Sequence, residues 1–208
     1  MTIANMIDDN SLVIDVGCDH AYLDIYLTKN RHNIKCIATD INFKIVELAK
    51  QRILKNNLEN KIEVRQSNGL DAISDSSEAI IVISGMGTNT ILNILKKDIS
   101  KLSKTLIIQS NNDLIELRKK IIKLGYYIED EKFVIDNSKN YVVIRFVKGN
   151  RKYRGIDYVL GPILKNDKDY LKRILKHYNG MINKIPAKLI IKKIKLKILV
   201  YKIKKRLL

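Results

Sequence analysis

The sequence is poor in cysteine and proline, and it contains no tryptophan. Its two cysteines, Cys18 and Cys36, do not have the spacing of a disulfide framework, so we expect free thiols in a reducing compartment. Three scattered histidines add no metal-ligand spacing, and we expect no metal site. The 208-residue chain is long enough for one hydrophobic core and an appendage, and neither disulfides nor metals are needed to stabilise it.

Long hydrophobic runs are absent as well. Even the apolar stretch Leu189–Val200 is interrupted by four lysines, which excludes a membrane-spanning helix there. The first nine residues lack the basic start and the apolar run of a signal peptide. We therefore expect a cytoplasmic protein without a membrane partner.

Acidic residues are nearly missing from the C-terminal part. The formal net charge is +17, and residues 151–208 carry +15 of it, because 18 Lys and Arg residues oppose only Asp157, Asp167 and Asp169. A coding bias towards lysine would not remove acids from one end alone. The asymmetry predicts a polyanionic partner such as RNA. An oligomerisation hairpin and a membrane-surface helix are alternatives, but the lack of acids disfavours self-association, so we expect a monomer.

The first 150 residues alternate between β-branched runs and helical patterns. Ala79–Ser84 (AIIVIS) is the clearest strand, apolar on both faces like the centre of a parallel sheet. Two consecutive strands joined around Asn137–Asn140 predict a final antiparallel hairpin. A closing antiparallel strand is typical of class I methyltransferases, whereas a plain dinucleotide-binding fold stays parallel. We predict strands at 11–16, 34–39, 61–65, 79–84, 105–109, 126–135 and 141–148. We predict one helix that follows the first strand and ends near residue 30, and further helices at 43–56, 88–95 and 113–124.

The remaining residues predict a separate helical domain. Residues 149–162 have the composition of a linker, and Asn166 or Asp167 is placed to cap a helix that Pro186 ends or kinks. An antiparallel two-helix hairpin would hide the apolar stripes of both helices. The stripes consist of Tyr170, Leu171, Ile174, Leu175, Tyr178, Met181 and Ile182, and, at coiled-coil spacing, Ile191, Ile194, Ile198 and Tyr201.

The segment Val13–Leu27 (VIDVGCDHAYLDIYL) carries the first candidate binding turn. Asp15, Gly17 and Asp19 follow the first strand at the sheet edge where α/β folds bind ligands. Glycine allows close approach of the backbone, while Asp19 would repel a pyrophosphate and suits the cationic amine and sulfonium of S-adenosylmethionine. The alternative is an ordinary turn with Asp19 as the helix cap.

Further polar turns fall at the ends of the next strands. Asp40 ends the second strand and can accept both ribose hydroxyls of an adenosine, unless it is a plain loop acid beside a capping Asn42. In QSNGL, Asn68 can bond an adenine edge, and the glycines of SGMGT (Ser84–Thr88) leave room for a flat substrate. The amides and hydroxyl of Gln109–Asn111 suit the edge of a base.

Four segments together resemble the bacterial tRNA (adenine-22-N1)-methyltransferases, and the likeness covers nearly the whole chain. It implies a class I methyltransferase fold with a Rossmann-like seven-stranded sheet, S-adenosylmethionine as methyl donor, and methylation of a D-arm adenine at N1. A coiled-coil-like C-terminal domain also fits GPILKND at 161–167. The four segments are DVGCDHAYLDIYL at 15–27, ISGMGTNTILNIL at 83–95, LIIQSNNDLIELRKKIIKLGYYI at 106–128 and YVVIRFVKG at 141–149.

Five positions depart from the pattern of that family. We expect serine or a small residue at Cys18, proline at Asp24 and aspartate at Asn68. We also expect a second glycine at Thr88 and proline at Ser110. Asn68 can still bond an adenine amino group through its side-chain oxygen, and Thr88 narrows the side of the site that receives the target base.

These arguments define two expected domains and one expected site. Residues 1–150 form the S-adenosylmethionine-dependent domain, and residues 151–208 form the basic helical domain that binds RNA. The residues expected at the cofactor are Asp15, Gly17, Cys18, Asp19, His20, Asp40, Ile41, Asn68, Gly69, Ser84, Gly85 and Met86. Those expected in the chemistry are Asp19 for charge, His20 and Tyr22 for shape or stacking, and Asn111 for the base edge.

Three other functions compete with tRNA adenine N1-methylation. The fold alone also allows methylation of a different RNA. A non-catalytic RNA-binding protein on a decayed methyltransferase fold is the second alternative. An NAD-dependent oxidoreductase is disfavoured by Asp19 and by the terminal hairpin.

Overall fold

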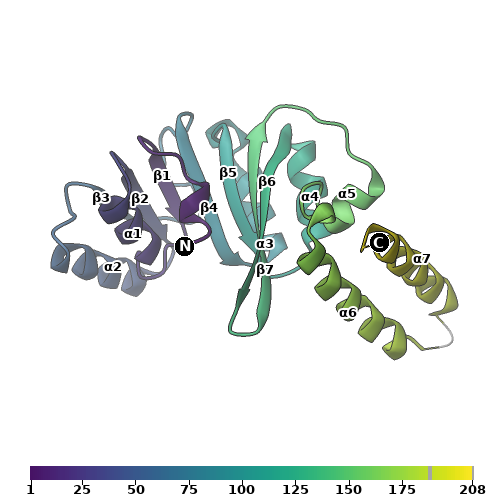
Figure 1. The fold of residues 1–208 in the computed structure, drawn as a ribbon. Coiled ribbons are helices and arrows are strands. Elements are labelled where there is room, and N and C mark those ends of the chain that lie inside the picture. The colour runs from purple at the N-terminus through teal and green to yellow at the C-terminus, as the bar shows by residue number, and fades with distance from the viewer. Residues whose placement is uncertain (187–188, 208) are drawn as a thin grey trace. The chain divides into compact units, whose positions relative to one another are not determined.

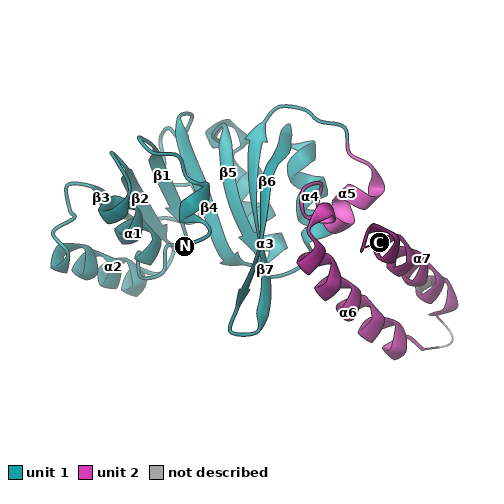
Figure 2. Ribbon diagram, viewed as in Figure 1, with its two compact units in different colours: residues 1–152 teal, residues 153–208 magenta. Residues whose placement is uncertain are grey.

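The computed structural model describes residues 1–186 and 189–207. It divides into two compact units, residues 1–152 and residues 153–208 (Figure 2). Each unit is a separate arrangement of elements, the first an α/β sheet and the second a set of helices (Figure 1). No helix in the described ranges is both long and apolar enough to cross a membrane.

The first unit is built on a seven-stranded sheet in the order β3-β2-β1-β4-β5-β7-β6. Neighbouring strands are parallel except for β7, which is antiparallel to both β5 and β6. This arrangement confirms the predicted class I methyltransferase fold with its closing antiparallel strand. The strands are β1 (Leu12–Val16), β2 (Lys35–Asp40), β3 (Ile62–Gln66), β4 (Ala79–Met86), β5 (Thr105–Ser110), β6 (Tyr126–Asp136) and β7 (Lys139–Lys148).

Helices cover both faces of the sheet. The chain moves one way from β1 to β3 and the other way from β4 to β5, so right-handed crossovers place the two sets of helices on opposite faces. One set is α1 (Tyr22–Asn30) and α2 (Phe43–Lys55), and the other is α3 (Thr88–Lys97) and α4 (Leu114–Lys123). The central strands β1 and β4 are buried on both faces, which explains their nearly continuous apolar sequence.

The second unit contains α5 (Gly155–Leu160), α6 (Lys168–Lys184) and α7 (Ile190–Leu207). The prediction of a linker over 149–162 is therefore wrong in its second half. The buried Asp157 carboxylate explains the difference, because it accepts the backbone N–H of Arg154 at 2.8 Å and pairs with Lys165 at 2.7 Å. Asp167 caps α6 by accepting the Tyr170 N–H at 2.9 Å, and α6 ends two residues before Pro186, both as predicted.

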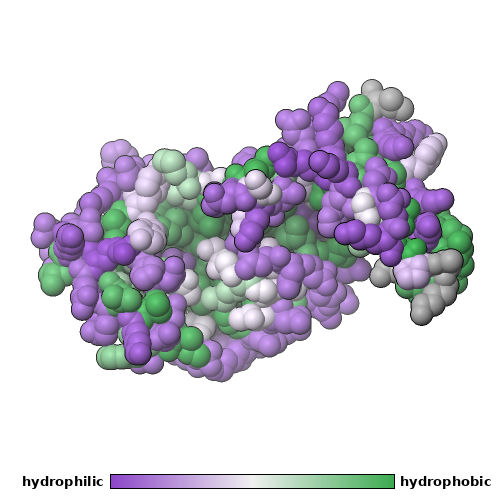
Figure 3. Space-filling view, turned by 90° about the horizontal axis from the view of Figure 1, so that it is seen from below, coloured by the Kyte–Doolittle hydropathy of each residue, from purple (hydrophilic) through white to green (hydrophobic). Residues whose placement is uncertain are grey.

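The predicted seam of α7 is wrong. Ile191 is 68% exposed and Tyr201 is 67% exposed, and Ile194 and Ile198 are also exposed. The helix packs beside α6 but buries Val200 and Ile203 instead (Figure 1). Because α7 carries apolar residues on two stripes, only one of them can face α6. The other leaves hydrophobic side chains among the lysines, and hydrophobic patches between hydrophilic ones are visible on the surface in Figure 3.

Candidate functional site

The carboxyl ends of four parallel strands surround a pocket of about 400 Å³. The neighbouring ends of β1, β2, β3 and β4 lie along one edge of the sheet, where open α/β folds bind ligands (Figure 1). Residues along the length of α3 close the other side. The lining residues are Val16, Gly17, Asp40, Ile41, Ser67, Asn68, Gly69, Met86, Thr90, Asn93, Ile94 and Lys97.

The turn after β1 brings backbone into this pocket. Gly17 has a φ of +77°, which favours glycine, and its N–H donates to the carbonyl of Thr39 at 2.8 Å. A Cβ on Gly17 would overlap the end of the Met86 side chain. The backbone conformation therefore favours glycine, and a Cβ would in addition displace the flexible end of the Met86 side chain.

Asp40 supplies the carboxylate of the pocket. One of its oxygens accepts the backbone N–H of Asn42 at 2.8 Å, and Asn42 in turn caps α2 by accepting the Lys44 N–H at 3.0 Å. The capping role considered for Asn42 is thus confirmed, and it holds the neighbouring acid in place. A carboxylate fixed at the pocket wall can accept hydrogen bonds from vicinal hydroxyls.

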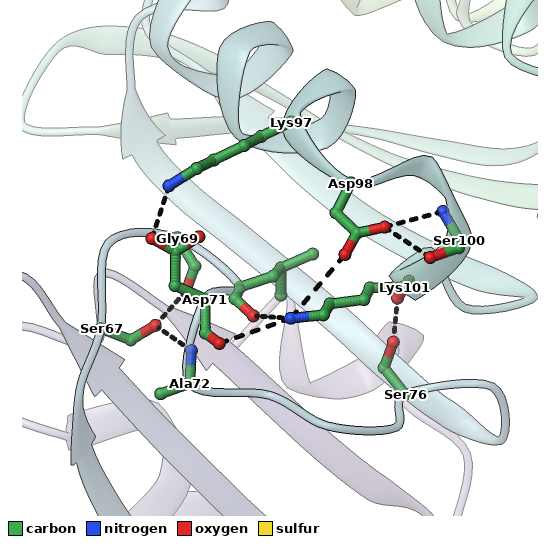
Figure 4. Close-up of polar contacts among 10 residues, drawn as sticks. Ser67, Gly69, Asp71, Ala72, Ser76, Lys97, Asp98, Ser100 and Lys101 are labelled. Atoms are coloured by element: carbon green, nitrogen blue, oxygen red, sulfur yellow. Dashed lines mark hydrogen bonds and ion pairs between the residues drawn. The ribbon is translucent and has the colours of Figure 1, made fainter.

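The loop after β3 forms the next wall and is held by its own polar contacts (Figure 4). The Ser67 hydroxyl donates to the carbonyl of Gly69 at 2.9 Å and accepts the N–H of Ala72 at 3.0 Å. Lys97, at the end of α3, forms an ion pair with Asp71. These contacts fasten the loop to α3 and hold the wall that carries Asn68 and Gly69.

A second hollow of about 710 Å³ lies at the end of β4 and β5. Gly85 lines this second pocket and its neighbour Met86 lines the first, so consecutive residues of β4 contribute to the two pockets. The other lining residues come from the N-terminal segment, from α1 and β5, and from the β6–β7 hairpin. They are Met1, Thr2, Ile3, Ala4, Tyr22, Leu23, Tyr26, Gln109, Asn111, Val134, Asp136, Tyr141 and Val143.

A closed amide network forms the floor of the second pocket. The Gln109 side-chain carbonyl accepts the Gly85 N–H at 2.8 Å, and its amide donates to Oδ1 of Asn111 at 3.1 Å. The Asn111 amide donates to the Gly85 carbonyl at 2.7 Å. Each side-chain amide keeps one further N–H, so the network can hold a flat polar ligand while it positions Gly85.

An aromatic group stands at the mouth of the second pocket. Tyr22 is 64% exposed, and the Arg52 guanidinium lies 4.1 Å from its ring centroid. The His20 ring meets it edge-on, with centroids 5.8 Å apart. Nε2 of His20 lies 3.6 Å from Asp19, while Nδ1 is buried and has no hydrogen-bond partner among the described residues. Because this nitrogen is buried, the contribution of His20 to the turn is its ring contact with Tyr22.

Two acids are buried behind the binding turn rather than in it. Asp15 on β1 and Asp24 on α1 are 4% and 0% exposed. Burial and the charge of Asp24 raise the pKa of Asp15 well above its ordinary value, and burial raises the pKa of Asp24 to about 6. Burial likewise raises the pKa of the free thiols of Cys18 and Cys36, so neither is a ready nucleophile.

The structure thus separates the residues predicted for the site. Gly17, Asp40, Ile41, Asn68, Gly69 and Met86 line the first pocket, and Tyr22, Gly85 and Asn111 line the second. Neither pocket is lined by Asp15, Cys18, Asp19, His20 or Ser84. Cys18, Asp19 and His20 lie in the turn after β1, whereas Asp15 lies in β1 and Ser84 lies in β4. The considered capping role of Asp19 is wrong, because the residue before α1 is Ala21, which makes no side-chain cap.

Sequence reasoning missed the contributions of α3 and of the β6–β7 hairpin. Thr90, Asn93, Ile94 and Lys97 follow each other at helical spacing, which is a usable signal that one face of α3 points to a single place. Nothing local marks Asp136 or Tyr141, which reach the second pocket only through the pairing of β7 with β5. Within the described ranges, no group of three or more metal-ligating side chains occurs.

Comparisons with known proteins identify the family and the fold of the chain. Residues 1–144 match the family described as a methyltransferase domain. The chain is 32% identical over 182 residues to the tRNA (adenine(22)-N(1))-methyltransferase of Bacillus subtilis, covering 83% of this chain and 76% of that protein. Sp1610 of Streptococcus pneumoniae, in complex with S-adenosyl-L-methionine, superposes with a TM-score of 0.88 at 27% identity, covering 100% of this chain and 97% of that one. TrmK of M. capricolum, in complex with S-adenosyl-homocysteine, gives 0.83 at 28% identity, covering 99% and 95%.

Proposed function

The chain belongs to the family of tRNA (adenine(22)-N(1))-methyltransferases, and we propose that it transfers the methyl group of S-adenosylmethionine to N1 of adenine 22 in the tRNA D-arm. The observation that carries this proposal is the pair of pockets whose walls include the consecutive residues Gly85 and Met86 at the end of β4. One pocket has the walls for a nucleoside with a free ribose. The other is open to a second flat ligand within reach of the first.

The first pocket fits S-adenosylmethionine. The Asp40 carboxylate is placed for the ribose hydroxyls, and Asn68 and Gly69 form the wall suited to an adenine edge. Gly17 leaves the space that a side chain would fill, and His20 shapes the adjoining turn through the edge-on contact of its ring with Tyr22. When bound, S-adenosylmethionine supplies the electrophilic methyl group. Ile41 and Met86 provide apolar contact.

Three further predicted residues have indirect parts in this proposal. Asp15 and Cys18 support the turn from behind, since both are buried. Asp19 has an exposed side chain (69%) and contributes negative charge near the sulfonium rather than a direct contact. Ser84 precedes the lining residue Gly85 and shapes the backbone there.

The second pocket receives the target adenine in this proposal. Adenine N1 has a free lone pair near neutral pH, so the reaction needs alignment of that nitrogen with the methyl group more than it needs a general base. The Gln109–Asn111 network offers N–H donors and carbonyl acceptors at the floor, and Tyr22 offers a face for stacking. Moving the base out of its helix costs a few kcal/mol, which contacts elsewhere on the tRNA have to offset.

The second unit supplies those contacts. Its acids are all engaged near the start of α5 and α6: Asp157 pairs with Lys165, Asp169 pairs with Lys172, and Asp167 caps α6. Helix α7 contains basic residues and no acid. Binding through phosphates is largely blind to sequence, so the shape of the tRNA has to provide selectivity. We further infer a monomer, because the lack of acids in the second unit disfavours self-association, and a cytoplasmic location, because the two cysteines are free thiols.

Methyl transfer to defined RNAs tests the proposal. Unmodified tRNA transcripts are incubated with labelled S-adenosylmethionine, and the product nucleoside is identified and mapped. One-methyladenosine at position 22 is expected, with an adenine 22→guanine transcript as the matched control without product. Methylation only of ribosomal RNA would favour the other-RNA alternative. Tight tRNA binding without transfer would favour the non-catalytic RNA-binding protein.

A further inference from the structure

Two hydroxyl groups join the ends of β4 and β5 at a point where both are buried. Thr88 begins α3 and is 2% exposed, while Ser110 ends β5 and is 5% exposed. Their oxygens lie 2.8 Å apart. The Thr88 hydroxyl also donates to the carbonyl of Asn112 at 2.6 Å, and the Asn112 side chain accepts the Thr88 N–H at 2.9 Å.

The protons of these hydroxyls are used within the junction. Each hydroxyl has one proton. When Thr88 donates to the Asn112 carbonyl, Ser110 donates to Thr88, and both protons are engaged. Ser110 also reaches the Asn112 carbonyl at 2.9 Å, so the reverse arrangement is equally complete. Neither hydroxyl has a proton left for a substrate, which makes the pair a positioning element.

The junction lies between the two pockets. On the Thr88 side, Met86 and residues of α3 line the first pocket, which is called the cofactor pocket from here on. On the Ser110 side, Gln109 and Asn111 line the second pocket, which is called the acceptor pocket because the proposed function places the target adenine there. The backbone N–H of Asn111 also donates to the Met86 carbonyl at 2.9 Å. This bond and the hydroxyl contacts connect the residues that follow β5 to the end of β4.

We propose that the Thr88–Ser110 hydroxyl pair fixes the acceptor pocket relative to the cofactor pocket, and so sets the alignment of the two substrates. The inference rests on the proposed methyl transfer for its catalytic consequence, but the geometric link does not depend on it. Each hydroxyl also reaches the Asn112 carbonyl, so the pair and that carbonyl form one buried cluster at the junction.

Removal of the hydroxyls tests the link. Thr88→Val keeps the shape and loses every bond of the Thr88 hydroxyl, whereas Ser110→Ala leaves the Thr88 bond to the Asn112 carbonyl. We expect kcat to fall roughly tenfold in Thr88→Val and roughly threefold in Ser110→Ala, on the scale of one or two hydrogen bonds. The double variant should lie no more than roughly threefold below Thr88→Val, because Ser110 then loses only its own contacts to the carbonyls of Asn112 and Met86. Thr88→Ser keeps the hydroxyl and should retain wild-type kcat.

The readouts separate positioning from general stability. The dissociation constant for S-adenosylmethionine and KM for tRNA should change less than threefold, because the other walls of each pocket remain. Hydrogen exchange should quicken in a peptide covering residues 109–113 of Thr88→Val and remain unchanged in β1. A Thr88→Val protein with wild-type kcat, or with unchanged exchange at 109–113, overturns the inference. If the wild-type protein transfers no methyl group, the proposed function fails, while the exchange result still decides whether the link exists.

Discussion

Gly17 at the end of β1 and Met86 at the end of β4 lie so close that a methyl group on Gly17 would overlap the methionine side chain. Gly17→Ala is expected to weaken S-adenosylmethionine binding at least tenfold, because a φ of +77° strains alanine and the added group enters the pocket. Isothermal titration with S-adenosylmethionine measures the loss.

A double variant distinguishes the effect of backbone strain at Gly17 from the effect of overlap with Met86. Met86→Ala in the Gly17→Ala background removes the overlap and leaves the backbone strain. Partial recovery of affinity is expected relative to Gly17→Ala alone, with Met86→Ala by itself as the reference. Full recovery would show that the positive φ carries no cost, and would contradict the preference of this backbone conformation for glycine.

The charge of the Asp40 carboxylate is expected to contribute to S-adenosylmethionine binding in the first pocket. Asp40→Asn preserves an oxygen that accepts the Asn42 N–H but removes the charge, so the turn should fold unchanged. Hydrogen bonds to charged groups contribute about 1.5–3 kcal/mol, and a loss of roughly 10- to 100-fold in affinity for S-adenosylmethionine is expected. Glu47→Gln, an exposed acid change on the neighbouring α2, is the control. Equal affinity of the two variants would remove Asp40 from the binding site.

The buried acid Asp24 makes stability depend on pH. Its pKa is about 6 in the folded protein and near 3.8 when unfolded, so the folded state holds a proton that the unfolded state releases between these values. The contribution of Asp24 to the free energy of unfolding therefore falls as pH rises from about 4 to 6, and it stays low at higher pH. Asp24→Asn removes the ionisation and should raise the free energy of unfolding by roughly 1–3 kcal/mol at pH 7.5.

The gain from Asp24→Asn should shrink as pH falls towards 4.5, since Asp24 is then protonated in the folded wild type. Urea unfolding at several pH values measures it. Glu59→Gln, an exposed acid change, should show no such trend. A gain that is constant across the range would mean that packing, rather than the buried charge, is responsible.

The ion pair of Arg118 and Glu131 lies entirely inside the first unit. Nε of Arg118 is 2.8 Å from Oε1 of Glu131, and both side chains are 0% exposed. Glu131→Gln should cost roughly 3–5 kcal/mol of unfolding free energy, because it leaves the arginine charge buried and poorly compensated. The exposed pair of Lys104 and Glu78 provides the comparison, and Glu78→Gln should cost less than about 1 kcal/mol. Thermal and urea unfolding distinguish these expectations.

The basic surface of the second unit predicts salt-dependent tRNA binding. Lys195 and Lys202 are exposed and line a groove between α5 and α7 together with Arg154. Changing both lysines to glutamine should weaken tRNA binding and reduce the slope of log affinity against log salt by up to about 2, if each lysine neutralises one phosphate. Filter binding from low to moderate salt gives the slope.

Two lysines of the first unit provide the control for charge alone. Lys35 begins β2 and Lys104 precedes β5, so both stand at the sheet edge opposite the pockets. Changing both to glutamine removes the same amount of positive charge. The slope of log affinity for tRNA against log salt should remain that of the wild-type protein. Equal slopes for the two double variants would show that the second unit holds no specific phosphate contacts.

Much of the first unit could be predicted from local patterns. The apolar run Ala79–Ser84, the helical stripe of 43–56 and the glycine after 113–124 each determine their element by themselves, and all appear within a few residues of the predicted bounds. Turn residues such as Gly17 and Asp40 could be found because parallel strands bring their carboxyl ends to one edge. The family likeness added the donor and the target base.

The remaining features depend on contacts between distant segments. The sequence of α7 has two apolar stripes, and only packing on α6 selected Val200 and Ile203 over Ile194 and Ile198. The place of Tyr141 in the acceptor pocket follows from the antiparallel register of β7 with β5, which no local pattern specifies. The sequence by itself determined the elements and the edge where ligands bind, because hydrophobic period and turn chemistry are local. Tertiary structure alone decided which side chains face the pockets and which acids are buried, because burial and register result from the approach of segments far apart in the chain.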